Sequence, residues 1–160
     1  MVWASRHTFC CAHPLCCALL AAAAAAAVAV SGGCQNYPYD PEKATRPYPV
    51  RLNQSEVIKV QVIPDLDTGN ITVVNATATS YTNFDLWLNR RYMKHVESLK
   101  SGETLEMNIE TFWDERGEGP FPGGLFRYFD PTPVVLAQMQ LAPDKPLIGL
   151  ECVPPNTDRR

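Results

Sequence analysis

The sequence predicts an all-β fold, a single antiparallel β-sandwich of about seven strands over residues 51–153. Apolar and polar residues alternate with a period of two in most segments of this region, which is typical of strands with one buried and one wet face. Asp, Asn, Gly and Pro separate these segments at short intervals. No segment carries an apolar period of 3.6 residues over three helical turns. A small closed or partly open barrel is the alternative architecture.

The strands follow one another with turn signals between most of them. Residues 57–63 and 71–75 are predicted to form a hairpin across the turn at 65–69, because both segments are rich in β-branched residues. One helical turn is expected near 110–115. Further strands are predicted at 84–88 (with Phe84, Leu86 and Leu88 on one face), 92–96, 104–109, 125–129 as a short edge strand, 133–142 and 147–153.

Residues 1–33 have the pattern of a lipoprotein-type signal peptide. An uncharged, alanine-rich run over 15–30 is shorter than the roughly 20 apolar residues of a membrane-spanning helix. Gly32 and Gly33 then stand directly before Cys34, and polar sequence follows. This order of residues resembles the processing site of bacterial lipoproteins. The resemblance implies that Cys34 becomes the first residue of the mature chain and carries the lipid that attaches it to a membrane.

The cysteines do not form a disulfide framework. Four of the six lie in the signal peptide: Cys10, Cys11, Cys16 and Cys17. Two interpretations stay open for the others. If Cys34 is lipidated, Cys152 is a lone thiol, for which burial in an apolar run is the ordinary state. Because Ser31 stands where lipoproteins usually have Leu, Val or Ile, cleavage further upstream also stays open, and Cys34 and Cys152 could then form one bridge.

Residues 34–50 are predicted to be a proline-rich tether. Pro38, Pro41, Pro47 and Pro49 exclude a helix or a central strand here. Such a segment is semi-extended and stiff, so we expect it to hold the domain a short distance from the membrane. At the other end of the domain, residues 154–160 are predicted to be a disordered tail.

Two short motifs resemble immunoglobulin-like modules of bacterial envelope proteins. The first is Asn75-Ala76-Thr77 after a strand, and the second is the turn Leu99-Lys100-Ser101-Gly102-Glu103-Thr104 that leads into another strand. The resemblance extends over residues 57–153 and includes small single-domain bacterial lipoproteins. It implies an immunoglobulin-like sandwich and brings no catalytic residues with it.

The candidate binding site is the glycine-rich loop over 114–130. Its carboxylates and the aromatic residues around it form the densest group of such side chains in the predicted domain. Loops on a rigid scaffold commonly bind ligands, and calcium takes carboxylate oxygens. The spacing does not match the twelve-residue calcium-loop pattern, so no metal site and no cofactor are assigned. The candidate residues are Trp113, Asp114, Glu115, Glu118, Phe121 and Asp130.

Catalytic residues are not predicted. His95 is the sole histidine after residue 33, and no serine stands in a nucleophile-elbow context. A formal net charge of −3 without a basic patch argues against nucleic acid as a partner.

We expect a non-enzymatic lipoprotein that is anchored in the cell envelope through Cys34 and faces the periplasm or the exterior. It would act as a structural or protein-interaction module with an envelope protein as its partner. The alternative is a secreted or periplasmic ligand-binding β-sandwich that uses the loop 114–130, with calcium as one candidate ligand.

Overall fold

Strands dominate the part of the chain that the structure, a computed structural model, describes: residues 37–123 and 130–153. No helix in these two ranges is long and apolar enough to cross a membrane. The predicted signal peptide, edge strand at 125–129 and tail lie outside the described residues. The elements are η1 (Pro41–Lys43), β1 (Gln54–Asp65), β2 (Asn70–Asn75), β3 (Tyr81–Leu88), β4 (Tyr92–Leu99), β5 (Thr104–Asn108), η2 (Ile109–Thr111), β6 (Ala137–Gln140) and β7 (Leu147–Cys152), where η marks a 3-10 helix.

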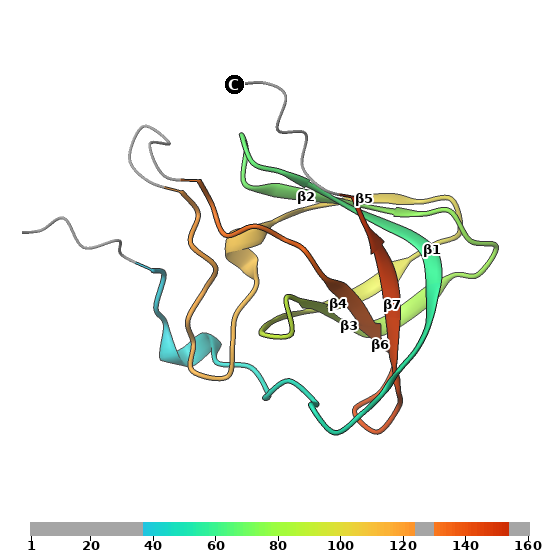
Figure 1. The fold of residues 1–160 in the computed structure, drawn as a ribbon, viewed down its shortest axis with the longest axis horizontal. Coiled ribbons are helices and arrows are strands. Elements are labelled where there is room, and N and C mark those ends of the chain that lie inside the picture. The colour runs from blue at the N-terminus through green and yellow to red at the C-terminus, as the bar shows by residue number, and fades with distance from the viewer. Residues whose placement is uncertain (1–36, 124–129, 154–160) are drawn as a thin grey trace, which may run out of the picture. The chain divides into compact units, whose positions relative to one another are not determined.

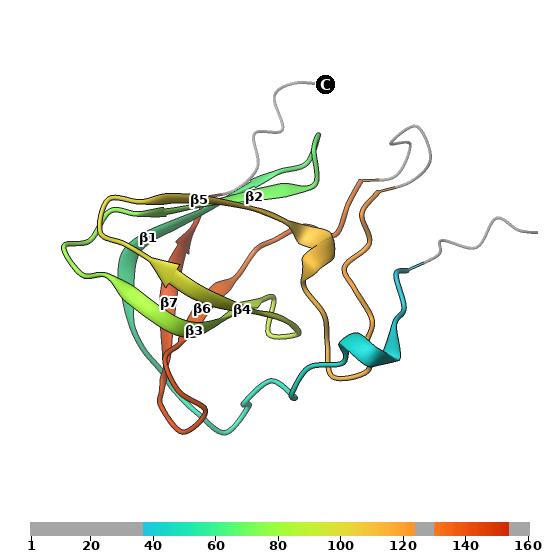
Figure 2. The ribbon, with the colours of Figure 1, turned by 180° about the vertical axis from the view of Figure 1, so that it is seen from behind.

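The seven strands form one sheet in the order β4-β3-β6-β7-β1-β2-β5. The sheet curls around its apolar face, so that the two strands at the ends of this order, β4 and β5, come round to the same side of the domain (Figures 1 and 2). The predicted all-β class is confirmed, and the arrangement is that of a nearly closed barrel. Hydrogen bonding alone does not divide the strands into two separate sheets.

The prediction that all strands pair antiparallel is wrong at β1. The first part of this strand lies parallel to β7, with Val57 opposite Gly149. Its last part lies antiparallel to β2, with Val62 opposite Val73. Apolar and polar residues alternate along a strand whether its neighbour runs parallel or antiparallel. The alternation therefore could not show that β1 and β7 are parallel.

The concave face of the curled sheet carries one apolar core. Phe84, Leu86 and Leu88 are all buried, which confirms that they share the inner face. Burying one such side chain stabilises the fold by about 1.5–3 kcal/mol. The other strands contribute Val60, Val62, Ile71, Val73, Tyr92, Val96, Leu99, Met107, Ala137, Met139 and Leu150.

One strand is shorter than predicted because a side chain takes over its backbone groups. The alternating pattern predicts a strand from residue 133, but β6 begins at Ala137. Asn89, in the turn after β3, accepts hydrogen bonds from the N–H groups of Val135 at 2.9 Å and Leu136 at 3.2 Å. Its Nδ2 donates to the Pro133 carbonyl at 2.7 Å. The segment is therefore bound to a side chain rather than to a strand.

A buried amide fixes the end of β2. Asn75 is fully buried, and its Nδ2 lies 2.8 Å from the carbonyl of Thr79, 3.0 Å from that of Lys100 and 3.3 Å from that of Leu99. Its Oδ1 accepts from the N–H of Thr77 at 3.0 Å. This one side chain therefore joins the approach to β3 with the end of β4.

Asn75→Ala should lower the free energy of unfolding by about 2–3 kcal/mol, because the buried Leu99 carbonyl and the part-buried carbonyls of Thr79 and Lys100 lose their donor. Asn53→Ala is a matched control, since the Asn53 side chain is exposed and makes no hydrogen bond within the described residues. Its effect should stay within about 0.5 kcal/mol. Urea denaturation measures both, and equal losses in the two variants would contradict the structural role of Asn75.

Candidate functional site

Asp114 is the centre of the candidate loop. Its side chain is buried, and its Oδ1 accepts hydrogen bonds from the N–H groups of Arg116 at 2.9 Å and Glu118 at 2.8 Å. The backbone closes the same turn, because the N–H of Asp114 donates to the Glu118 carbonyl at 2.9 Å. An aspartate whose side chain caps its own turn is a common way to order a loop.

The second oxygen of Asp114 binds an arginine from the turn before β4. Arg91 Nε donates to Asp114 Oδ2 at 2.9 Å, and the same guanidinium forms an ion pair with Glu118. Burial alone would raise the pKa of the Asp114 carboxyl. The hydrogen bonds from Glu118, Arg116 and Arg91 outweigh burial and hold that pKa below its ordinary value of 3.8. Asp114 is therefore ionised, and both of its carboxylate oxygens have hydrogen-bond donors.

The N-terminal part of the domain packs against this loop, although residues 34–50 are expected to be a tether. The Asp40 N–H donates to the Gly117 carbonyl at 2.8 Å, and the Gly119 N–H donates to the Pro38 carbonyl at 2.8 Å. Gly117 has a φ of +77°, and a Cβ there would lie 2.2 Å from the Asp40 carbonyl oxygen. Figures 1 and 2 both show this segment alongside the chain that precedes residue 124.

The docked segment continues onto the outer face of β3 and β6. Arg46 forms an ion pair with Asp85 at 2.6 Å, and its guanidinium carbon lies 4.8 Å from the centre of the Trp87 ring. Tyr48 donates from its hydroxyl to Gln138 at 2.8 Å and meets the Trp87 ring edge-on at 5.3 Å. From Pro38 to Tyr48 the chain is thus packed against the folded domain and is not an extended tether.

Of the six predicted site residues, Asp114 and Glu118 come together at Arg91, while Trp113 and Phe121 each contact the N-terminal segment. The backbone of Trp113 forms an isolated β-bridge with that of Met93. Its indole ring lies under Lys43, whose Nζ is 4.6 Å from the ring centre. Phe121 is buried, with its ring 5.5 Å from that of Tyr37. Both aromatic side chains therefore hold the N-terminal segment in place. Asp114 and Glu118 share Arg91, as described above.

Glu115 and Asp130 do not join this cluster in a ligand set. Glu115 is exposed at the turn that Asp114 caps, and Asp130 is exposed at the far end of the loop. The residues described at 37–123 and 130–153 contain no group of three or more Asp, Glu, His or Cys side chains placed to hold a metal ion. A groove of about 700 Å³ does lie beside the cluster, lined by Pro47, Tyr48, Val50, Arg90, Arg91, Asp114, Glu115, Arg116 and Glu118.

His95 has a partner that sequence reasoning missed. Its Nδ1 lies 2.9 Å from Asp85 Oδ1, while Asp85 Oδ2 holds Arg46. The three residues are far apart in the sequence, and their contact follows from the pairing of β3 with β4 and from the docked segment. The register places His95 directly opposite Asp85, and side chains at directly opposite positions of two strands are close enough to form a hydrogen bond.

Cys152 is half-buried and free among the described residues. Its Sγ lies 3.3 Å from the Val134 carbonyl, and burial raises the pKa of its thiol. Cys34 lies outside the described residues, so the choice between lipid and bridge stays a prediction.

Comparison of the chain with protein-family models, with curated proteins and with solved structures gave no match. The geometry of the site is therefore interpreted on its own chemistry.

Asp114→Asn should lower the free energy of unfolding at pH 7 by about 1–2 kcal/mol and flatten its dependence on acid pH. The pKa of Asp114 is lower in the folded chain, so the carboxylate stabilises the fold above the unfolded-state value of about 4. This contribution is lost as the pH falls through the folded-state pKa. Glu115→Gln, at an exposed carboxylate, is the control. Urea unfolding at several pH values tests this, and an Asn variant with the acid dependence of the parent chain would refute it.

Millimolar calcium should leave the melting temperature unchanged, because both oxygens of Asp114 are occupied and Glu118 is paired with Arg91. Differential scanning calorimetry with calcium or with a chelator measures the shift. A calcium-dependent rise that Asp114→Asn abolishes would restore the calcium hypothesis.

Proposed function

We propose that this chain is a non-enzymatic, lipid-anchored interaction module of a bacterial cell envelope. The anchor is Cys34, on the basis of the run of apolar and small residues that precedes it. The observation that supports an anchored module best is the docking of Pro38 and Asp40 onto the loop at 117–119. The folded domain begins only a few residues after the proposed anchor, so an extended linker would reach about 14 Å at most. The domain then lies close to the membrane surface.

An interaction role suits the chemistry of the polar clusters better than catalysis does. Asp114 and Asp85 are each held by an arginine, Arg91 and Arg46, that also binds a second polar side chain. These pairs fix the loop and the N-terminal segment in place. A module of this kind presents a rigid surface to another envelope protein.

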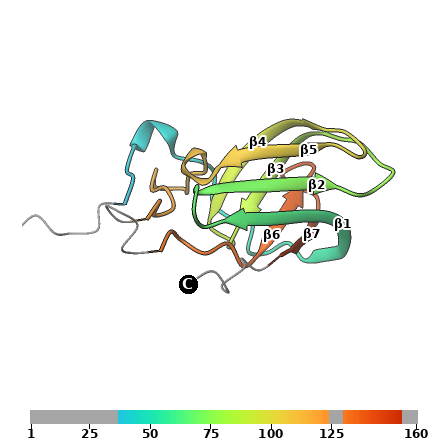
Figure 3. The ribbon, with the colours of Figure 1, turned by 90° about the horizontal axis from the view of Figure 1, so that it is seen from above.

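We also propose that the domain is an immunoglobulin-like sandwich that shares β1 between its two layers. The support is the pairing of β1 with β7 over residues 54–62 and with β2 over residues 60–65. The layers would be β4-β3-β6-β7 and β1-β2-β5, the latter side by side in Figure 3. A crystal structure with these layers about 10 Å apart, face to face, would support the assignment. Direct hydrogen bonding of β4 to β5 would overturn it.

Cys34→Ser should move the protein from the membrane fraction to the soluble fraction, because acyl chains supply the attachment. Fractionation of expressing cells and mass spectrometry of the mature N-terminus measure this. Cys152→Ser is the matched control and should stay in the membrane fraction. An unmodified N-terminus upstream of residue 34 in the parent chain, or a bridge between the two cysteines, would refute the lipid anchor.

A further inference from the structure

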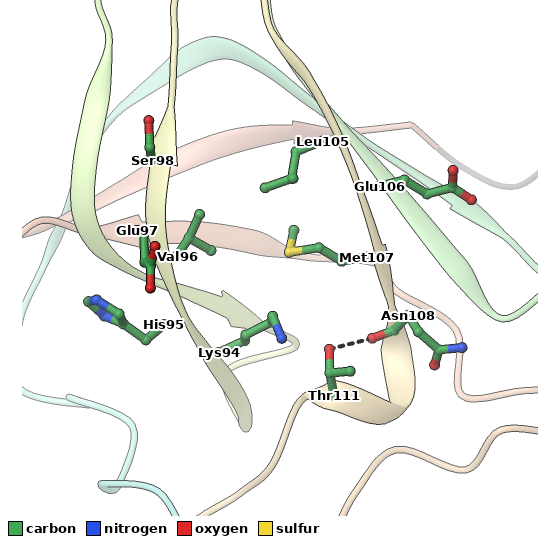
Figure 4. Close-up of a pocket in the computed structure, with 10 residues that line it drawn as sticks. All are labelled: Lys94, His95, Val96, Glu97, Ser98, Leu105, Glu106, Met107, Asn108 and Thr111. Atoms are coloured by element: carbon green, nitrogen blue, oxygen red, sulfur yellow. Dashed lines mark hydrogen bonds between the residues drawn. The ribbon is translucent and has the colours of Figure 1, made fainter.

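An opening separates the two edge strands of the sheet. β4 and β5 are joined by a turn at residues 100–103, and near the start of β4 the opening is bounded by Trp113, which bridges to Met93. Between these limits lies a cavity of about 510 Å³, with side chains of both strands directed toward it (Figure 4). Its lining residues are Lys94, His95, Val96, Glu97, Ser98, Leu105, Glu106, Met107, Asn108 and Thr111.

The backbone of β4 offers hydrogen-bonding groups to this opening. The N–H and the carbonyl of Met93 bond to Trp113 at 2.9 and 3.1 Å, so both groups point away from β3. Because orientation alternates along an antiparallel strand, the backbone groups of His95 and Glu97 point the same way. No hydrogen bond joins these groups to another described segment.

The backbone of β5 also offers hydrogen-bonding groups to the opening, from the side opposite β4. The Ile109 N–H donates to the Gly69 carbonyl, and the Asn75 N–H donates to the Glu103 carbonyl, both at 2.9 Å. The odd-numbered positions between these bonds therefore face β2, and the groups of Thr104 and Glu106 face the opening. Each edge is a template on which one more strand can pair.

The floor of the opening is apolar, with one cation. Val96 and Met107 are buried at its centre, and Leu105 is half-buried beside them. Lys94 of β4 occupies an inner-face position, because it pairs with the buried Leu86 of the neighbouring strand β3. Its ammonium makes no ion pair or hydrogen bond within the described residues. A half-buried cation without an anion gains most from a carboxylate brought to it.

We infer that the β4–β5 opening binds an extended peptide segment of a partner protein by strand addition. The peptide places an apolar side chain over Val96 and Met107 and an acidic side chain, two residues away on the same face, against Lys94. Its backbone pairs with the free groups of His95 and Glu97. This inference rests on the interaction role proposed above and is independent of the lipid anchor.

A peptide suits the opening better than a second copy of this chain. The inner-face positions of β4 near Lys94 are Tyr92, Val96 and Ser98, none of which is acidic. Pairing of two β4 edges with their inner faces on the same side would therefore leave Lys94 without a carboxylate.

Binding can be tested with the full chain in detergent and a fluorescein-labelled peptide, Lys-Thr-Val-Thr-Asp-Thr-Val-Thr-Lys. A matched peptide carries Lys in place of Asp. We expect the parent chain to prefer the acidic peptide, and Lys94→Glu to weaken its binding by about five- to tenfold and to favour the basic peptide. Lys59→Glu, at an exposed lysine on β1, is the control and should leave both affinities unchanged.

Glu97→Pro provides a second variant that acts on the backbone, and Glu97→Gln, which removes the same charge but keeps the N–H, is its control. The proline variant removes an N–H that faces the opening, and proline is tolerated at such an edge position. Fluorescence anisotropy should show loss of binding, while circular dichroism stays that of the parent chain. Equal binding to the parent chain, Lys94→Glu and Glu97→Pro, or no binding of either peptide at millimolar concentration, overturns the inference. A dimer in sedimentation equilibrium that Glu97→Pro dissociates also overturns it, in favour of a second copy as the occupant. Membrane attachment through Cys34 is measured separately, so the two proposals can fail independently.

Discussion

The fold depends on the double pairing of β1. This strand has 12 residues, and it is parallel to β7 at its start and antiparallel to β2 at its end. Among the described strands, it is the one whose backbone pairing joins the group β4-β3-β6-β7 to the group β2-β5. Val60 and Val62, at the stretch where β1 pairs with β7 on one side and with β2 on the other, are fully buried. Without this strand each group would expose its apolar face, because no second layer would be held against it.

Hydrogen bonds from polar side chains hold the loops in place. Asn75, Asn89 and Asp114 each satisfy several backbone groups that no strand reaches. Arg91 and Arg46 then extend this arrangement to the loop and the N-terminal segment. Buried backbone groups must find partners, so an irregular segment can be packed only where a side chain supplies them. This explains how a domain with long non-strand segments keeps them ordered.

The sequence predicted the strands well because their alternation records which face is buried. The inner-face set Phe84, Leu86 and Leu88 and the hairpin of β1 with β2 are examples. It could not predict strand order or direction, because period two carries no information on the neighbouring strand. The proline-rich segment was misjudged for a similar reason. Its prolines indicate an extended chain, but its docking depends on Gly117 and Asp85, which are distant in sequence.

Within the candidate site, the sequence named Asp114 and Trp113 but assigned them no partners. Arg91 belongs to a turn far from residue 114 in the sequence, and the bridge between Met93 and Trp113 brings the two segments together. Asp114 therefore serves the loop rather than a ligand. A dense group of carboxylates in a sequence predicts a binding site only if arginines of other segments leave its oxygens free.

The open side of the sheet follows from the same topology. A sheet that curls without closing must keep two edges from pairing at random, and a charged residue pointing inward from an edge strand is one known device. Lys94 has that position. An inward-pointing lysine can serve both purposes. It disfavours pairing with an apolar or basic strand, and it favours a strand that carries a carboxylate at the matching position. The residue that prevents indiscriminate pairing at β4 is thus also the one that can select a partner.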